Sequence, residues 1–233
     1  MDPDRTARFR HLHREGTFVM PNPYDAGSAR LLTALGFEAL ATTSGGFAAS
    51  LGRPDMSVSR TELVEHVRRI CEATSLPVNV DAEQCFPGSP GGVAETVGRL
   101  AGAGAAGCSI EDWDPRARSI ETVGVAVERV VQAAAAAGAS GLVLTARAEN
   151  HLRGRDDLDD TIARLAAYAS AGADVVYAPG LTDLAAITRV VGEAGAPVNV
   201  LLRRGGPLVA ELAAAGVRRV SVGGALAWVA YGA

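Results

Sequence analysis

The chain repeats one local pattern, in which a helical segment ends at a glycine and an apolar run follows almost at once. The five glycines of this pattern are Gly36, Gly107, Gly138, Gly172 and Gly216. Each is expected to adopt the left-handed conformation that commonly ends a helix. Strands that alternate with helices in this way indicate βαβ units and a parallel sheet.

Eight apolar segments are predicted to be strands, and helical segments separate them. The expected strands are residues 17–20, 38–43, 77–81, 107–111, 141–147, 174–178, 197–202 and 217–222. The expected helices are residues 5–14, 26–35, 61–73, 91–103, 122–137, 158–171, 181–195 and 207–215. Eight such units in about 220 residues fit a (β/α)₈ or TIM barrel better than an open sheet. The strands are apolar on both faces, as covered parallel strands are. We therefore expect residues 1–233 to form a single barrel domain.

The end of the chain departs from this pattern. Only eleven residues follow Val222, the last residue of the eighth expected strand. The eighth helix is therefore expected to be short, missing or swapped with a neighbouring subunit. Three explanations are open: an incomplete barrel, a truncated chain, or a subunit that covers this face.

The segment Pro77–Glu83 combines a buried strand with two carboxylates. Asp81 and Glu83 alternate, so the two-residue period of a strand would place them on the same side. Two acids held that close repel each other unless they share a proton or a cation. A divalent cation is the interpretation that we favour at the end of a parallel strand. The alternative is that one acid caps a helix and the other is solvated.

Other polar residues also follow predicted strands, and in a (β/α)₈ barrel the active site lies at those strand ends. Glu111 and Arg147 end two of them, and Asp55 lies in a loop that could reach the same place. Carboxylate oxygens suit Mg²⁺, and an arginine can bind a substrate carboxylate through two hydrogen bonds. Arg147 could instead pair structurally with Glu149 or Asp174. The remaining candidates, for substrate binding, are Ser44, Gly45, Gly46 and Asn199.

Composition excludes several kinds of chemistry. All 22 basic residues are arginine, so no lysine side chain is available for a Schiff base or for pyridoxal phosphate. The net charge of −4 gives no basic surface for nucleic acid. No apolar run reaches the roughly 18 residues of a membrane span, and the N-terminus lacks the apolar core of a signal peptide. Three widely spaced cysteines suggest the reducing cytoplasm.

The motifs together resemble those of the isocitrate lyase/phosphoenolpyruvate mutase superfamily. The resemblance covers nearly the whole chain from Pro21 to Gly224. The stretches that carry it are PNPYDAGSARLL, TTSGGFAASLGRPD, VNVDAE, GCSIED, TARAEN, YASAGADVVYAPG, APVNVL and GVRRVSVGGALA. It implies a TIM barrel of the phosphoenolpyruvate/pyruvate-domain type. It also implies homo-oligomers, dimers or tetramers, in which subunits exchange the eighth helix.

The resemblance also implies site roles. Mg²⁺, or Mn²⁺ in its place, would be held directly by Asp81. Asp55, Glu83 and Glu111 would act largely through water. A 2-oxo acid or its enolate would be bound by Arg147 and by Ser44, Gly45 and Gly46.

The loop after the fourth expected strand departs from the family pattern. Isocitrate and methylisocitrate lyases carry a lysine- and cysteine-containing loop there, whereas residues 112–119 contain neither residue. We therefore expect a Mg²⁺-dependent carbon–carbon lyase that acts on a small 2-oxo mono- or dicarboxylic acid, or its adduct, through an enolate. An oxaloacetate decarboxylase-like reaction is one form of this. The alternatives are a P–C bond enzyme, such as a phosphonopyruvate hydrolase or phosphoenolpyruvate mutase, and a non-catalytic barrel that binds 2-oxo acids.

Overall fold

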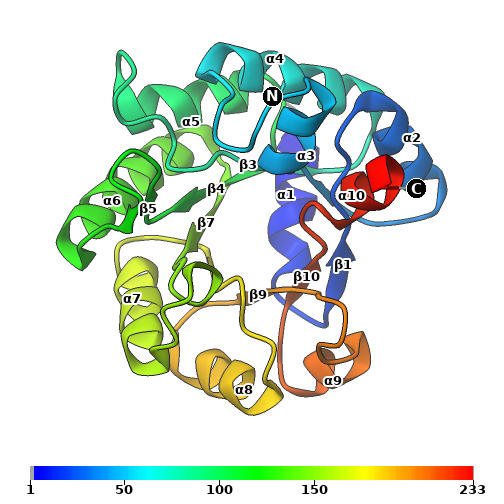
Figure 1. The fold of residues 1–233 in the computed structure, drawn as a ribbon. Helices are drawn as coiled ribbons and strands as arrows, with labels where there is room; N and C mark the ends of the chain where they lie inside the picture. The colour runs from blue at the N-terminus through cyan, green and yellow to red at the C-terminus, as the bar shows by residue number, and fades with distance from the viewer. Residues whose placement is uncertain (1–2, 233) are drawn as a thin grey trace.

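The computed structural model describes residues 3–232, and eight parallel strands form its central sheet (Figure 1). They are β1 (Phe18–Met20), β2 (Leu40–Ala41), β3 (Val78–Asp81), β4 (Gly107–Glu111), β7 (Val143–Arg147), β8 (Val175–Tyr177), β9 (Val198–Leu201) and β10 (Arg219–Ser221). Their order in the sheet is β1-β10-β9-β8-β7-β4-β3-β2. The backbone N–H of Ala41 links the two end strands by donating to the carbonyl of Pro21 at 3.0 Å. The barrel is therefore nearly closed, as predicted.

Helices surround the barrel in the order that the alternating pattern predicts (Figure 1). They are α1 (Pro3–Leu12), α2 (Ala26–Ala34), α3 (Ser44–Ser50), α4 (Arg60–Ala73), α5 (Gly92–Gly102), α6 (Val123–Ser140), the 3₁₀ helix η1 (His151–Arg153), α7 (Leu158–Ser170), α8 (Leu184–Glu193), α9 (Val209–Ala214) and α10 (Ala225–Gly232). The first helix closes the N-terminal end of the barrel. Phe9 lies edge-on to His13 and Phe18, with ring centroids 4.8 and 6.3 Å away. Ligand access is therefore confined to the C-terminal ends of the strands.

Helix ends confirm part of the glycine pattern and correct the rest. Gly36, Gly172 and Gly216 have positive φ angles, as predicted. Gly107 instead opens β4, where an added Cβ would lie 2.7 Å from Phe9 Cε1, so the close approach of α1 requires glycine there. Gly138 lies within α6, which extends to its left-handed cap at Gly141. The prediction for Gly138 was wrong because the helix continues to a glycine further along the chain. The prediction for Gly107 was wrong because a tertiary contact, with Phe9, decides the conformation there.

The second strand is shorter than predicted, and the segment after it is a helix rather than a loop. Thr43 caps α3, and its hydroxyl accepts from the backbone N–H of Gly46 at 3.3 Å. The glycines Gly45 and Gly46 therefore belong to a first helical turn. Gly46 is also packed tightly, since an added Cβ would lie 3.1 Å from Ala227 of α10.

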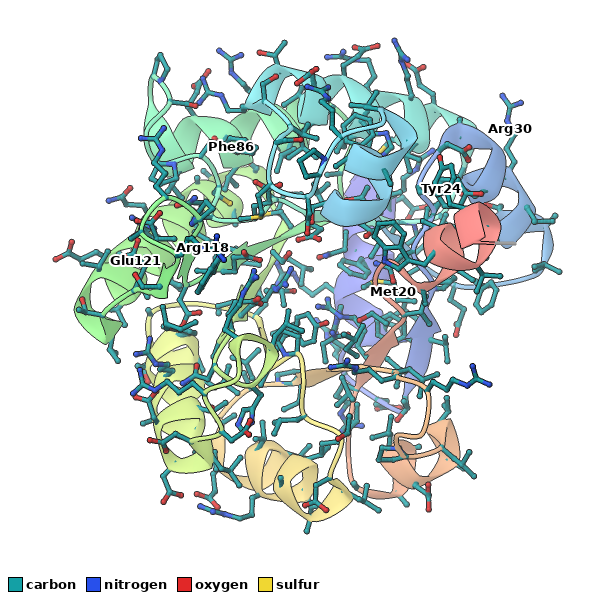
Figure 2. The ribbon with its side chains drawn as sticks, viewed as in Figure 1. Met20, Tyr24, Arg30, Phe86, Arg118 and Glu121 are labelled. Atoms are coloured by element: carbon teal, nitrogen blue, oxygen red, sulfur yellow. The ribbon has the colours of Figure 1, made fainter. Side chains whose placement is uncertain are left out.

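The last helix, α10, has only eight residues, which agrees with the expected short eighth helix. It lies over α3 (Figure 1), and Tyr24, labelled in Figure 2, lies beside it with its ring centroid 5.8 Å from that of Tyr231. Trp228 and Val229 on the same helix are more than half exposed. In the described residues, no helix has both the length and the apolar character of a membrane span.

The buried histidine His66 generates a prediction about acid stability. Burial lowers the pKa of His66 to about 4, whereas the unfolded value is about 6.5. The folded protein therefore binds fewer protons below pH 6.5, and stability falls as the pH falls toward 4. Between pH 7 and pH 5 this group should cost the wild type about 2 kcal/mol. His66→Phe keeps the ring stacked on Phe47 and should abolish that loss in urea unfolding.

A matched control for this prediction is His11→Gln, because His11 is exposed on α1. That variant should lose as much stability on acidification as the wild type. An equal loss in His66→Phe and the wild type would contradict the assignment.

Candidate active site

One guanidinium and three carboxylates meet at the ends of β3, β4 and β7. Arg147 NH1 lies 2.8 Å from Asp81 Oδ1, and Arg147 NH2 lies 3.2 Å from Glu111 Oε2. The same NH2 group lies 2.8 Å from Glu149 Oε1. Arg147 therefore pairs with Glu149, which was one of the two expected structural partners, and it also contacts the predicted metal ligand Asp81. The other expected partner, Asp174, pairs with Arg10 instead. Arg147 and the three acids are largely buried, so water screens their charges weakly.

Acids outnumber the cations around this group, and their pKa values reflect it. Burial, followed by repulsion from Asp81 and Asp55, raises the pKa of Glu83 to about 8. Burial and then the charge of Asp81 raise the pKa of Asp55. Burial, and next the neighbouring Glu149, raise the pKa of Glu111 well above its usual value. Such a cluster of carboxylates is a candidate site for a positively charged ligand.

The backbone around Asp81 fixes the direction of its carboxylate. The Asp81 N–H donates to Thr42 Oγ1 at 2.9 Å, and the N–H of Ser44 donates to Asp81 Oδ2 at 3.1 Å. Asp55 approaches from its loop, and its carboxyl carbon would lie 3.4 Å from a Cβ at Gly45. Glycine at that position therefore lets the Asp55 carboxylate lie against the start of α3.

Glu83 reaches the cluster by a route that differs from the predicted one. The strand β3 ends at Asp81, so strand alternation does not place Glu83. Its backbone is instead left-handed, with φ of 52°, and its carbonyl accepts from the Glu111 N–H at 3.0 Å. A non-glycine residue in this conformation is uncommon and occurs often at functional sites.

A cavity of about 190 Å³ opens above the barrel strands. Its charged end contains Asp81, Asp55, Ser44, Gly45 and Arg147. The predicted residues Glu83, Glu111 and Gly46 do not line it. Asn199 does, and its side chain joins Ser221 Oγ at 3.0 Å and Arg219 Nε at 2.9 Å. Met20, labelled in Figure 2, and further residues complete the lining: Asn22, Ala41, Thr42, Thr43, Asn79, Ser109, Leu152, Tyr177, Pro179, Leu201, Gly223, Gly224 and Trp228.

The sequence analysis missed several cavity residues, among them the charged or aromatic side chains of Arg219, Tyr177 and Trp228. Arg219 is fully buried at the inner end of the cavity. A charged residue inside the apolar strand VRRVSV was a signal for it. Tyr177 lies under Arg147, with the guanidinium carbon 5.2 Å from the ring centroid. Trp228 comes from α10, and only the three-dimensional packing of that helix brings it to the cavity.

Two residues beside the site have structural roles. Cys85 is fully buried, and burial raises the pKa of its thiol well above the usual value, which opposes a role as nucleophile. Asp112 is also buried and accepts hydrogen bonds from Tyr168 Oη at 2.7 Å, Arg164 NH1 at 3.1 Å and the Glu149 N–H at 2.9 Å. It thereby holds the segment that carries Glu149.

The loop after β4 forms a small hairpin. Its strands β5 (Trp113–Asp114) and β6 (Ser119–Ile120) are antiparallel. Trp113 lies under the guanidinium of Arg153, 4.1 Å from its carbon to the ring centroid. Arg153 lies 3.6 Å from Glu149 Oε2. The hairpin is therefore connected through two side chains to the group that orients Arg147.

The donor set fits a hard divalent cation that keeps part of its water shell. Among residues 3–232, no three His, Cys, Asp or Glu side chains converge closely enough to ligate an ion together. Asp81 is the carboxylate that lines the cavity beside Asp55. Glu111 Oε1 is buried and has no hydrogen-bond partner. One direct carboxylate with others behind it is the arrangement typical of Mg²⁺.

Comparison with known proteins decides the family. A family profile described as phosphoenolpyruvate phosphomutase matches residues 9–233. The chain belongs to this family. The superfamily resemblance inferred from the motifs is thereby confirmed, together with the TIM barrel that it implies.

This chain shares most of its length with a solved structure. It is 52% identical to a Burkholderia cenocepacia J2315 protein provisionally described as a lyase/mutase, with a TM-score of 0.94 over 99% of this chain and 84% of that one. It is 33% identical to the 2-methylisocitrate lyase of Escherichia coli K12, over 75% of this chain and 61% of that protein. It is 36% identical to the oxaloacetate decarboxylase of Paraburkholderia xenovorans LB400, over 72% and 58%. The chain thus spans about three fifths of these two curated relatives.

The contacts of Asp112 generate a prediction about stability. Asp112→Ala removes one of the two carboxylates that pair with the buried Arg164, which keeps Asp160, and leaves the Tyr168 hydroxyl and the Glu149 N–H without their acceptor. Each buried donor left unsatisfied typically costs about 1–3 kcal/mol, and urea unfolding should show a decrease of a few kcal/mol. Asp159→Ala is the control, since its carboxylate is exposed, and it should leave the unfolding free energy almost unchanged. A loss as small as that of the control would contradict the structural role.

Proposed function

We propose that this protein is a Mg²⁺-dependent lyase that cleaves a carbon–carbon bond of a small 2-oxo acid and leaves an enolate. The observation that carries the proposal is the excess of carboxylates around Asp81, beside an arginine and at one end of a small polar cavity. The relatives named as 2-methylisocitrate lyase and oxaloacetate decarboxylase support the same class of reaction. The cavity volume of about 190 Å³ suits a substrate of a few carbons.

Asp81 would hold the cation directly, and Asp55, Glu83 and Glu111 would contribute through water. Mn²⁺ would suit the same oxygen donors. The bound cation would supply positive charge beside the oxygens of the 2-oxo acid and of the enolate. It would also lower the repulsion that raises the pKa values of Glu83 and Asp55.

Arg147 would bind the substrate carboxylate. Its guanidinium has five N–H donors, and the ion pairs with Asp81, Glu111 and Glu149 hold it at the cavity edge. Glu149 fixes its orientation by accepting from both Nε at 3.1 Å and NH2 at 2.8 Å. The N–H of Gly45, at the start of α3, lies at the same end of the cavity and would donate to a substrate oxygen, whereas the N–H of Ser44 donates to Asp81 Oδ2.

The protein would also exclude two other routes to the enolate. Without lysine, no iminium can form on a side-chain amine. The hairpin between residues 112 and 119 has no cysteine to act as a general acid. Decarboxylation requires neither a lysine nor a cysteine general acid from such a site, because water can protonate the enolate after carbon dioxide leaves. An oxaloacetate decarboxylase-like reaction is therefore the form that we favour.

The same hairpin supports a second candidate, a barrel that binds 2-oxo acids without turnover. Tight Mg²⁺-dependent binding of a 2-oxo acid, with no product detected by NMR, would favour that candidate. Release of phosphate from phosphonopyruvate would instead identify a P–C bond enzyme.

Turnover tests the proposed reaction. With Mg²⁺, the wild type should convert a four-carbon 2-oxo diacid to pyruvate and carbon dioxide, and EDTA should stop the reaction. Asp81→Asn should lower kcat by roughly 10²–10³-fold, because it would weaken binding of the cation that stabilises the enolate, and loss of one oxyanion-stabilising contribution costs about that much. Asp159→Asn should retain wild-type rates. Turnover that persists in EDTA, or that is absent on every 2-oxo acid tried, would argue against the lyase.

Thermal unfolding tests the cation site without relying on activity. At a Mg²⁺ concentration of 100 times Kd, a cation that binds only the folded state adds about 2.7 kcal/mol. For a chain of this size the Tm should rise by roughly 5–10 °C. Asp81→Asn should lose that rise, whereas Asp114→Asn on the hairpin should keep it. An equal rise in wild type and Asp81→Asn would place the cation elsewhere.

A further inference from the structure

The inner end of the cavity holds the guanidinium of Arg219, which forms no ion pair with a carboxylate in the part of the chain that the structure describes. Arg219 is 1% exposed, lines the cavity and makes three polar contacts. Its Nε donates to Asn199 Oδ1 at 2.9 Å, and its NH2 donates to Thr145 Oγ1 at 2.9 Å. Its NH1 lies 3.3 Å from His13 Nε2. Among residues 3–232, no Asp or Glu forms an ion pair with it.

The third partner is also neutral. His13 Nδ1 lies 2.8 Å from the carbonyl of Phe9 and can only donate to it, so Nε2 is the acceptor for Arg219. Burial, followed by the charge of Arg219, lowers the pKa of His13 to about 3. Burial likewise lowers the pKa of Arg219 to about 9. A buried guanidinium with uncharged partners alone is unfavourable unless an anion joins it.

The two arginines that line the cavity therefore differ in their carboxylate partners. Arg147 already contacts three carboxylates, whereas Arg219 contacts none. The guanidinium of Arg219 has five N–H donors, of which its three contacts use three. The remaining two are available to an anion in the cavity. Asn199 and Ser221, which also line the cavity, add an amide and a hydroxyl beside it.

We propose that Arg219, with Asn199 and Ser221, forms a second anion subsite at the inner end of the cavity and binds the far carboxylate of a dicarboxylic substrate. The inference rests on the proposed function, since Arg147 and the Asp81 site bind the 2-oxo acid group at the other end. It deepens that function by naming the residues that would bind the far carboxylate of the four-carbon diacid and so select a diacid over a monocarboxylic 2-oxo acid.

The register of the strands supports a separation between Arg219 and Arg147 that a four-carbon diacid can span. Arg147, Tyr177, Asn199 and Arg219 are paired in succession across β7, β8, β9 and β10. The Arg219 guanidinium reaches Thr145, which lies two residues before Arg147 on β7. Two residues of a strand rise about 7 Å. Three carbon–carbon bonds of about 1.5 Å, with a hydrogen bond of about 2.9 Å at each end, span that step.

Isothermal titration calorimetry in the presence of Mg²⁺ tests the subsite with three probes. Malate and lactate share a 2-hydroxy acid group, and only malate has a second carboxylate. Oxalate reports on the Asp81 and Arg147 end alone. The wild type should bind malate about 30-fold more tightly than lactate, which is typical of a hydrogen-bonded charge pair. Arg219→Gln should lose that preference and should bind lactate and oxalate within about threefold of the wild type.

Two further variants keep the test decisive. Arg218→Gln changes the neighbouring arginine, which donates to the carbonyl of Gly16 instead, and should retain the malate preference. Arg219→Lys keeps the charge and should retain part of it. Circular dichroism and Tm establish that each variant is folded. If Arg219→Gln does not fold, the wild-type preference and its partial retention in Arg219→Lys decide the question.

The outcomes separate the subsite from the proposed function. Equal binding of malate and lactate by the wild type, or an unchanged preference in Arg219→Gln, overturns the subsite. If oxalate still binds in that case, the 2-oxo acid site stands. Malate binding that depends on Arg219, without Mg²⁺-dependent turnover of any 2-oxo acid, supports the subsite and contradicts the lyase. Binding of none of the three probes overturns both.

Discussion

The buried ion pairs between Arg147 and the carboxylates of Asp81, Glu111 and Glu149 are the constraint on which the rest of the site depends. Removing charged groups from water is costly, and the cost is offset only where opposite charges lie close together. Arg147, even with Arg153 beside Glu149, cannot offset three carboxylates and the two further acids, Asp55 and Glu83, beside them. The barrel therefore maintains a local excess of negative charge next to its cavity. Binding of a cation would relieve that excess.

The order of strands in the barrel produces this arrangement. The strands β3, β4 and β7 are neighbours, and Glu111 is in register with Arg147. Residues at the C-terminal ends of adjacent parallel strands meet even though Asp81 and Arg147 are 66 positions apart in sequence. For this reason the sequence was sufficient to predict the barrel and to predict that Asp81, Asp55 and Arg147 lie close together. Each of these inferences needed only strand periodicity and the general position of active sites in (β/α)₈ barrels.

The features that sequence reasoning missed depend on contacts between distant segments. Gly107 opens β4, where Phe9 packs against it, and the cap predicted at Gly138 lies at Gly141 because α6 continues past Gly138. The first turn of α3 was missed because its cap, Thr43, is adjacent to a strand of only two residues. Arg219 was not among the predicted site residues, yet strand alternation directs it into the barrel, while Arg218 donates to the carbonyl of Gly16.

The two ends of the cavity carry opposite uncompensated charges, and this polarity would determine the orientation of a bound diacid. At the outer end, excess carboxylates require a cation before an anionic substrate can approach. At the inner end, Arg219 attracts an anion without any such requirement. Under the proposed function, a diacid would place one carboxylate at Arg219 and its 2-oxo acid group beside Asp81 and Arg147. The carbons between the two carboxylates would then lie between Arg219 and Arg147, the two arginines that line the cavity. Reversing the diacid would bring its 2-oxo group to Arg219, away from the carboxylates that are proposed to hold the cation.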